Sequence, residues 1–263
     1  MSIQETRDKD RLRRLFARDP IGAIYMLGDL EESAFCHCRW YVDDDRGVLL
    51  LYAGLAVPVV LPFGDAAALV REVTLPDRFY TKVTDAERRL FSDWELSEPE
   101  ELYVMGLREL IRPSSVPGLR MRLISDPALI EPLYSDYPGN YFSPEQVPYG
   151  LYAAAEFDGR IVAAGGTHAW ARDEGAAALG NIVTAAAYRG QGIGRALVAY
   201  LCDELQARGC RHIGLHVHRL NRSAVNCYRS IGFTVHSEIT QWTASREGLP
   251  QPEVEPHRNI SQL

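Results

Sequence analysis

Cysteine is scarce in this chain, and its usage excludes a disulfide-stabilised secreted protein. The 263 residues include five cysteines, an odd number without the regular spacing of a disulfide framework. Unpaired cysteines are typical of a reducing compartment, so we expect a cytoplasmic protein. The first fourteen residues carry charges from the start, unlike a secretory signal peptide. The tight triplet Cys36-His37-Cys38 lacks zinc-site spacing and a second ligand pair, so we predict no metal site.

Long hydrophobic runs and basic clusters are also missing. The longest apolar run, residues 48–62, is interrupted by Gly54 and Pro58 and is too short to cross a bilayer as a helix. No block of five or more lysines and arginines occurs, and the net charge is −7. These features predict a protein that binds neither membranes nor nucleic acids. The remaining composition, 46% hydrophobic and 24% charged, is that of an ordinary globular protein.

What the chain does contain is a glycine-rich segment between an apolar run, residues 176–183, and an amphipathic helix. The segment consists of Arg189, Gly190, Gln191, Gly192, Ile193, Gly194 and Arg195. The first N–H groups of a helix have no partner within the helix and carry partial positive charge. Glycines let a phosphate approach the backbone, and the two arginines add full positive charges. The segment therefore predicts a pyrophosphate-binding loop; the alternative is an ordinary glycine-rich turn before a helix.

Two common phosphate-binding signatures do not fit this segment. A dinucleotide fingerprint would require glycine at position 195 or 197, where the chain has Arg195 and Leu197. A P-loop would require a Gly-Lys-Ser/Thr ending, which does not occur here. The pattern that remains is Arg-x-x-Gly-x-Gly, from Arg189 to Gly194.

A second motif lies at residues 221–233, after a strand-like alternation over residues 212–218. Its fixed positions are Asn221, Ala224, Tyr228, Gly232 and Phe233. Asn221 is a favourable helix N-cap and Gly232 a favourable helix stop. We therefore expect a short helix that carries Ala224 and Tyr228 on one face.

Together, the two segments resemble the acyl-CoA-binding signature and the second motif of the GNAT acetyltransferase superfamily. The resemblance implies an α/β (α+β) fold, with a C-terminal GNAT domain whose mixed central sheet is flanked by helices. It also implies that acetyl-CoA is the acyl donor. The backbone amides of the loop from Arg189 to Gly194 would then bind the CoA pyrophosphate.

The length of the chain suits two domains, and a segment rich in proline, glycine and serine at residues 113–118 predicts a linker. We expect an N-terminal α/β domain at 1–112, a catalytic GNAT domain at 119–243 and a polar tail at 244–263. The N-terminal elements repeat the order of the second half, but residues 61–66 offer one glycine, no arginine and an acidic Asp65. Two alternatives stay open: a degenerate GNAT-like domain without a working CoA site, or an unrelated small α/β domain.

Periodicity predicts several further elements. Helices are expected over residues 5–18, 66–73, 85–94 and 127–134, and strands over residues 78–83, 119–124, 212–218 and 233–242. A hairpin is expected across Asp158 and Gly159, a favoured two-residue turn. The segment from Tyr134 to Phe142 contains four aromatic residues. The resemblance implies that this segment walls the acceptor site; the alternative is that its rings pack within the domain.

The resemblance also implies a mechanism, the direct transfer of an acetyl or other short acyl group from acyl-CoA to a primary amine in a ternary complex. Ile182, Val183 and Thr184 would lie along the cofactor, and a backbone N–H near Val183 would polarise the thioester carbonyl. Tyr228 would bind at the cofactor and act as the general acid for the departing thiolate. Asn221 would contact the cofactor or cap the helix that carries Tyr228.

The sequence leaves the general base and the acceptor open. Candidates for the base are Glu156, His168 and His218; the alternative for the histidines is the polar face of a partly exposed strand. The acceptor would be an amine on a small molecule or a peptide, and no oligomeric state is assigned. A non-enzymatic acyl-CoA-binding sensor or interaction module is the alternative function.

Overall fold

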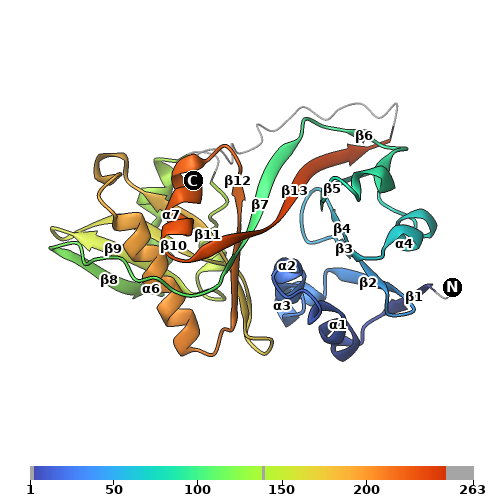
Figure 1. Ribbon diagram of the computed structural model, residues 1–263, viewed down its shortest axis with the longest axis horizontal. Helices are drawn as coiled ribbons and strands as arrows, with labels where there is room; N and C mark the ends of the chain where they lie inside the picture. The colour runs from blue at the N-terminus through green and yellow to red at the C-terminus, as the bar shows by residue number, and fades with distance from the viewer. Residues whose placement is uncertain (1–2, 138–139, 247–263) are drawn as a thin grey trace. The chain divides into compact units, whose positions relative to one another are not determined.

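The computed structural model describes residues 3–137 and 140–246 (Figure 1), which fall into two compact units. Among these residues, unit 1 combines the N-terminal part of the chain, up to Tyr103, with residues 237–246. Unit 2 is formed by residues 104–236. Each unit contains strands of a mixed sheet with helices packed against them, as the predicted α/β fold class requires.

Unit 1 begins with a strand and three short helices and continues with a mixed sheet. Its elements are β1 (Ile3–Thr6), α1 (Lys9–Phe16), α2 (Ile24–Gly28), α3 (Glu32–Phe35), β2 (Cys38–Asp43), β3 (Gly47–Tyr52), β4 (Val59–Gly64), α4 (Ala67–Glu72), β5 (Arg78–Val83), the 3₁₀ turn η1 (Arg88–Phe91), β6 (Glu95–Leu96) and β7 (Glu100–Leu107). Strands β1 to β4 are antiparallel neighbours in chain order, and β5 runs parallel to β4. A core cluster gathers Leu49, Leu69, Phe79 and Phe91 between the sheet, α4 and η1.

Unit 2 repeats this strand topology with longer elements. Its elements are β8 (Leu119–Ile124), η2 (Pro127–Leu129), α5 (Glu131–Ser135), η3 (Pro144–Gln146), β9 (Tyr152–Phe157), β10 (Arg160–Ala171), β11 (Ala176–Thr184), η4 (Ala186–Tyr188), α6 (Ile193–Ala207), β12 (His212–His218), α7 (Arg222–Ser230) and the start of β13 (Phe233–Ser245). Strands β8 to β11 are antiparallel neighbours, and β12 runs parallel to β11. The long helix α6 packs on β8 to β11. The order and directions of β8 to β12 therefore match those of β1 to β5.

Strand β13 completes the sheet of unit 1 although it follows all of unit 2 in the chain. Its residues 240–245 pair antiparallel with residues 78–83 of β5, and its end pairs with β6. Trp242 and Ala244 enter the unit 1 core from this strand. Among the described residues, unit 1 is therefore made of two separate stretches of chain.

The unit boundaries differ from the predicted linker for a physical reason. Residues that precede the linker already bond to unit 2: the Arg108 N–H donates to the Gly232 carbonyl at 3.1 Å, and the Arg112 guanidinium pairs with Asp203 at 2.5 Å. The chain thus divides at Tyr103 and again at His236. The start of the predicted tail, residues 244–245, is the end of β13; residues 247–263 lie outside the described residues.

Local capping explains where two predicted helices differ from the structure. The region predicted as a helix over residues 5–18 starts with the end of β1, and α1 begins only at Lys9. Asp8 caps this helix, since its carboxylate accepts from the Arg11 N–H at 2.9 Å. The predicted helix at residues 85–94 is only the 3₁₀ turn η1. Trp94 turns back to pack on Phe79, with ring centroids 4.8 Å apart.

Other predicted elements are confirmed by the structure. The strands predicted at residues 78–83, 119–124 and 212–218 are β5, β8 and β12. The turn between β9 and β10 has positive φ at Asp158 (49°) and Gly159 (74°), as a two-residue hairpin requires.

Within the described part of the chain, no helix has the length and apolar character needed to span a membrane.

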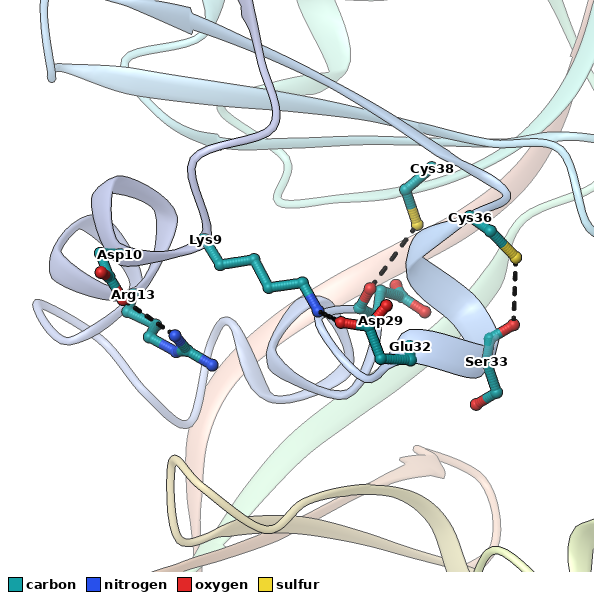
Figure 2. A network of polar contacts seen from close by, with 8 residues as sticks. All are labelled: Lys9, Asp10, Arg13, Asp29, Glu32, Ser33, Cys36 and Cys38. Atoms are coloured by element: carbon teal, nitrogen blue, oxygen red, sulfur yellow. Dashed lines mark hydrogen bonds and ion pairs between the residues drawn. The ribbon is translucent and has the colours of Figure 1, made fainter.

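The Cys36-His37-Cys38 triplet is arranged for local hydrogen bonding. The Cys36 thiol points to the Ser33 carbonyl at 3.6 Å, and the Cys38 thiol lies 3.8 Å from the Asp29 carbonyl (Figure 2). Cys38 also lies 3.3 Å from the Ala34 carbonyl. Residues 3–137 and 140–246 contain no group of three or more histidine, cysteine or acidic side chains that could hold a metal ion.

The pairing of β13 with unit 1 predicts that Trp242→Ala destabilises unit 1. The side chain is 4% exposed, and truncating a buried tryptophan costs about 3–5 kcal/mol of unfolding free energy. Urea unfolding followed by circular dichroism would measure this loss. Thr243→Ala is the matched control, because neighbouring strand residues point to opposite faces. Equal losses for the two variants would show that β13 does not complete the unit 1 core.

Candidate active site

The glycine-rich segment forms an open loop at the start of α6. Gly190 and Gly192 have φ of +75° and +82°, and a side chain at position 190 would meet nothing within 4 Å. The Ala196 N–H donates to the Gly192 carbonyl at 3.0 Å and is the first of α6 to find a backbone acceptor. In the described chain, the amides of residues 193–195 have no backbone acceptor. The loop therefore presents backbone donors to an open space.

Two arginines place positive charge beside these donors. The Arg189 Nε donates to the Thr184 carbonyl at 3.0 Å, which holds this side chain against the end of β11. The Arg195 guanidinium folds over the loop, 3.4 Å from where a Cβ of Gly192 would lie. Gln191 turns back and donates to the Ala187 carbonyl at 3.3 Å. Backbone donors, a helix N-terminus and two guanidinium groups together suit a pyrophosphate.

Strands β11 and β12 pair over only part of their length. Residues 176–179 of β11 are matched with residues 212–215 of β12 in parallel register, and the pairing ends there. Strand β11 continues through Ile182 and Val183 to Thr184, still paired with β10 on its other side. Beyond Leu179, at the same end as the loop, β11 is thus not paired with β12.

A β-bulge lies in this unpaired part of β11. Between two register pairs, Ala164–Val183 and Gly166–Gly180, β11 advances by three residues while β10 advances by two. Asn181 adopts the unusual backbone conformation within the bulge, with a φ of +56°, and it is only 2% exposed. A bulge leaves one residue out of the ladder, so it frees a backbone group next to Val183.

Hydrogen bonds hold Asn181 from three sides. Its side-chain amide donates to the Gln146 Oε1 and to the Tyr152 hydroxyl, both at 2.9 Å. The Tyr134 hydroxyl donates to the Asn181 carbonyl at 2.6 Å. Sequence reasoning missed Asn181, Gln146 and Tyr152; the available signal was an asparagine, a residue suited to positive φ, inside an apolar strand.

Tyr228 and Asn221 occupy the predicted positions on α7. The Asn221 side chain caps this helix by accepting from the Ala224 N–H at 3.1 Å. Tyr228 is 6% exposed, and its ring lies 5.9 Å from that of Phe233. Burial raises the pKa of the adjacent Cys227 thiol to about 11, whereas the charge of Arg195 acts to lower it. Helix α6, which carries Arg195 in its first turn, packs against α7.

The three candidate bases lie on three different strands. Glu156 on β9 pairs with Arg122 at 3.7 Å, and His218 at the end of β12 accepts from the Leu220 N–H through its Nδ1 at 3.2 Å. His168 on β10 lies against Gly180, just before the bulge. Glu156 is matched with Ile161, seven residues from His168, or roughly 23 Å along the strand, so these two residues do not share one site.

The aromatic segment splits between core and surface. The rings of Tyr134 and Phe142 stack with centroids 4.1 Å apart and are buried in the cluster around Val183. Tyr137 is half-buried and donates to the Thr184 carbonyl at 3.3 Å, and Tyr141 is 41% exposed. Two of the four rings therefore pack within the domain; Pro138 and Gly139 lie outside the described residues.

The corresponding segment of unit 1 lies against the turn between β2 and β3. The Asp65 carbonyl lies 2.2 Å from where a Cβ of Gly47 would stand. Arg46 from this turn pairs with Asp43 at 2.5 Å and approaches Asp65 to 3.7 Å. An arginine and an acidic residue thus interact before α4, where the corresponding segment of unit 2 carries glycines and two arginines.

Comparison with known proteins assigns unit 2 to a family. The profile of the acetyltransferase (GNAT) family matches residues 120–233. The [ribosomal protein bS18]-alanine N-acetyltransferase of Escherichia coli K12 is 44% identical over 74 residues, which are 27% of this chain and 50% of that protein. The chain thus spans about half the length of this curated relative.

Solved structures share the fold over nearly the whole chain. A GCN5-related N-acetyltransferase from Sphaerobacter thermophilus aligns over 95% of this chain and 97% of its own, with a TM-score of 0.61 and 16% identity. A tandem GNAT protein from the clavulanic acid biosynthesis pathway aligns over 92% of this chain and 97% of its own, with a TM-score of 0.55 and 12% identity. Residues 120–233 of the chain are therefore a domain of the acetyltransferase (GNAT) family.

Proposed function

We propose that unit 2 transfers an acetyl or other short acyl group from acyl-CoA to a primary amine. The observation that carries the proposal is the open loop before α6, with its backbone donors and its two arginines at the end of β11. Acetyl-CoA fits this set of donors, because the loop would hold its pyrophosphate while the unpaired edge of β11 receives the extended arm. When bound, acetyl-CoA supplies an activated thioester.

The residues of unit 2 suit three steps of this reaction. A backbone N–H near Val183, freed by the bulge, would donate to the thioester oxygen as negative charge develops there. Tyr228 would protonate the departing thiolate; ordinary pKa values of about 10 for a phenol and 8.5 for a thiol make this transfer feasible. The amine must lose a proton, and His168 is the candidate base that lies beside the bulge.

Three further assignments concern the base, unit 1 and the acceptor. Glu156 and His218 stay as alternative bases, although an arginine pairs with the first and the second already uses its Nδ1 lone pair. We propose that unit 1 is a GNAT-like unit without a CoA site, which its repeated topology and the Arg46–Asp65 pair before α4 support. The acceptor would be a small-molecule or peptide amine. Five free cysteines support a cytoplasmic location.

Acetyl-CoA and CoA should raise the thermal unfolding temperature, whereas NAD should not. A ligand present at about one hundred times its Kd, and bound only by the folded state, adds about 2.7 kcal/mol of stability. Differential scanning fluorimetry would measure the shift. The absence of a shift with either CoA species would contradict the loop assignment.

Amine-dependent release of CoA separates an enzyme from a sensor. Binding of acetyl-CoA without release in the presence of a broad panel of small amines and peptides would favour the non-enzymatic sensor or interaction module.

Gly192→Asp should abolish binding of CoA by adding a negative charge and a strained side chain to the loop. Isothermal titration calorimetry would measure the loss. Gly209→Asp is a matched control: Gly209 also has positive φ (+87°) and open surroundings, but it follows the other end of α6. Retained affinity in the Gly192 variant would contradict the pyrophosphate site.

Tyr228→Phe should reduce turnover about 10²- to 10⁴-fold, the usual contribution of a general acid, with little change in acetyl-CoA affinity. Steady-state release of CoA and calorimetry would measure the two effects. Tyr200→Phe, on α6, removes a hydroxyl of the same kind from a half-buried position and serves as the control. Unchanged turnover in the Tyr228 variant would show that the tyrosine is not the acid.

A further inference from the structure

We propose that Asn181 is a positioning residue, which fixes the β11 bulge so that the backbone N–H near Val183 faces the thioester oxygen of acetyl-CoA. The inference rests on the proposed function and assigns a role to the hydrogen-bond network around Asn181. Asn181 itself would not touch the reacting atoms.

The backbone conformation of Asn181 needs support from its surroundings. A φ of +56° is uncommon for any residue except glycine, although asparagine tolerates it better than most. Without such support, the position of a bulge can shift by one residue along the strand. Strand registers that differ by one residue compete, because side chains alternate between the two faces of a sheet. A shift would turn the backbone N–H next to Val183 away from the ligand.

The hydrogen-bond network fixes the orientation of the Asn181 side chain. Both protons of its side-chain amide have acceptors, Gln146 Oε1 and the Tyr152 hydroxyl, and these two groups also bond to each other at 3.0 Å. Gln146 is itself held by the Ser143 N–H, which donates to the same Oε1 at 3.2 Å. Three side chains thus form a closed triangle.

The carbonyl of Asn181 is fixed separately. The Tyr134 hydroxyl donates to it at 2.6 Å, and the Tyr134 ring is itself held by stacking on Phe142. Burial raises the pKa of Tyr152 to about 12 and that of Tyr134 well above its usual value, so both hydroxyls keep their protons. The side chain of Asn181 and the peptide group that follows it are therefore both constrained.

The network requires particular residues in the neighbouring strands. The Tyr152 ring lies over the backbone of β10, only 2.6 Å from where a Cβ of Gly166 would stand. Residue 166 is also the partner of Gly180 at the bulge. The glycine in β10, the tyrosine in β9 and the asparagine in β11 thus depend on one another across three strands.

The thioester carbonyl reports directly on this role, without an identified acceptor amine. Acetyl-CoA labelled with ¹³C at the carbonyl would be bound to the full chain and examined by isotope-edited infrared spectroscopy. In the wild type we expect the carbonyl band at lower frequency than in free acetyl-CoA, because a hydrogen bond weakens the C=O bond. Calorimetry on the same samples would give the Kd.

Asn181→Gly keeps the positive φ accessible and removes the side-chain amide. We expect its carbonyl band to return to the frequency of free acetyl-CoA, with a Kd within about three-fold of the wild type, because the loop before α6 is intact. Tyr152→Phe removes one hydroxyl and keeps the ring; we expect an intermediate, broadened band. Asp158→Gly is the matched control, since it also replaces a residue at positive φ (49°) but lies in the β9–β10 turn.

The outcomes separate the two proposals. A shifted band in the wild type and in Asn181→Gly alike would overturn the positioning role and leave the proposed function standing. An unshifted band in the wild type would overturn the positioning role as well. A wild type that fails to bind acetyl-CoA would overturn the proposed function and, with it, the role of Asn181.

Discussion

The arrangement of the candidate site in unit 2 depends on how few residues of two neighbouring strands pair with each other. Strands β11 and β12 stay together for only four residue pairs, from Ala176 with His212 to Leu179 with Leu215. Because the two strands are parallel, their carboxyl ends leave the sheet at the same edge, and the segments that follow both begin there. The chain after β11 forms the loop and α6, and the chain after β12 forms α7 with Tyr228. The loop with its backbone donors, the unpaired part of β11 and the helix that carries Tyr228 thus all follow from the separation of these two strands.

The two units show how one topology serves different ends. In both units, a helix connects two neighbouring strands that pair in parallel. Helix α4 connects β4 with β5 in unit 1, and α6 connects β11 with β12 in unit 2. Unit 2 keeps the start of its helix open with three glycines between two arginines. Unit 1 has a six-residue helix, and Arg46 joins the neighbouring turn to Asp65 in front of it. The start of the helix in unit 1 thus has an acidic side chain beside it, where unit 2 has two arginines.

Features set by local physics could be predicted from the sequence. The glycine loop, the Asn221 cap and the Asp158–Gly159 turn each follow from conformational preferences of a few adjacent residues. The bulge at Asn181 could not be predicted in this way, because the alternation of residues along a strand does not reveal where one extra residue is inserted. Its partners Gln146 and Tyr152 lie 35 and 29 residues away in the chain. Composition likewise predicts a boundary at residues 113–118, whereas the compact units divide within two strands, after Tyr103 in β7 and after His236 in β13.

The position of β13 affects the order in which the molecule can be assembled. A ribosome makes residues 237–246 after all of unit 2, yet these residues pair with β5 and bring Trp242 beside Phe79 in the unit 1 core. During synthesis, β5 therefore waits as an uncovered edge, of the kind that pairs with other chains, until unit 2 has emerged. Unit 2 can gather most of its sheet and α6 earlier, since β8 to β12 are consecutive. The unit made first is thus the one completed last.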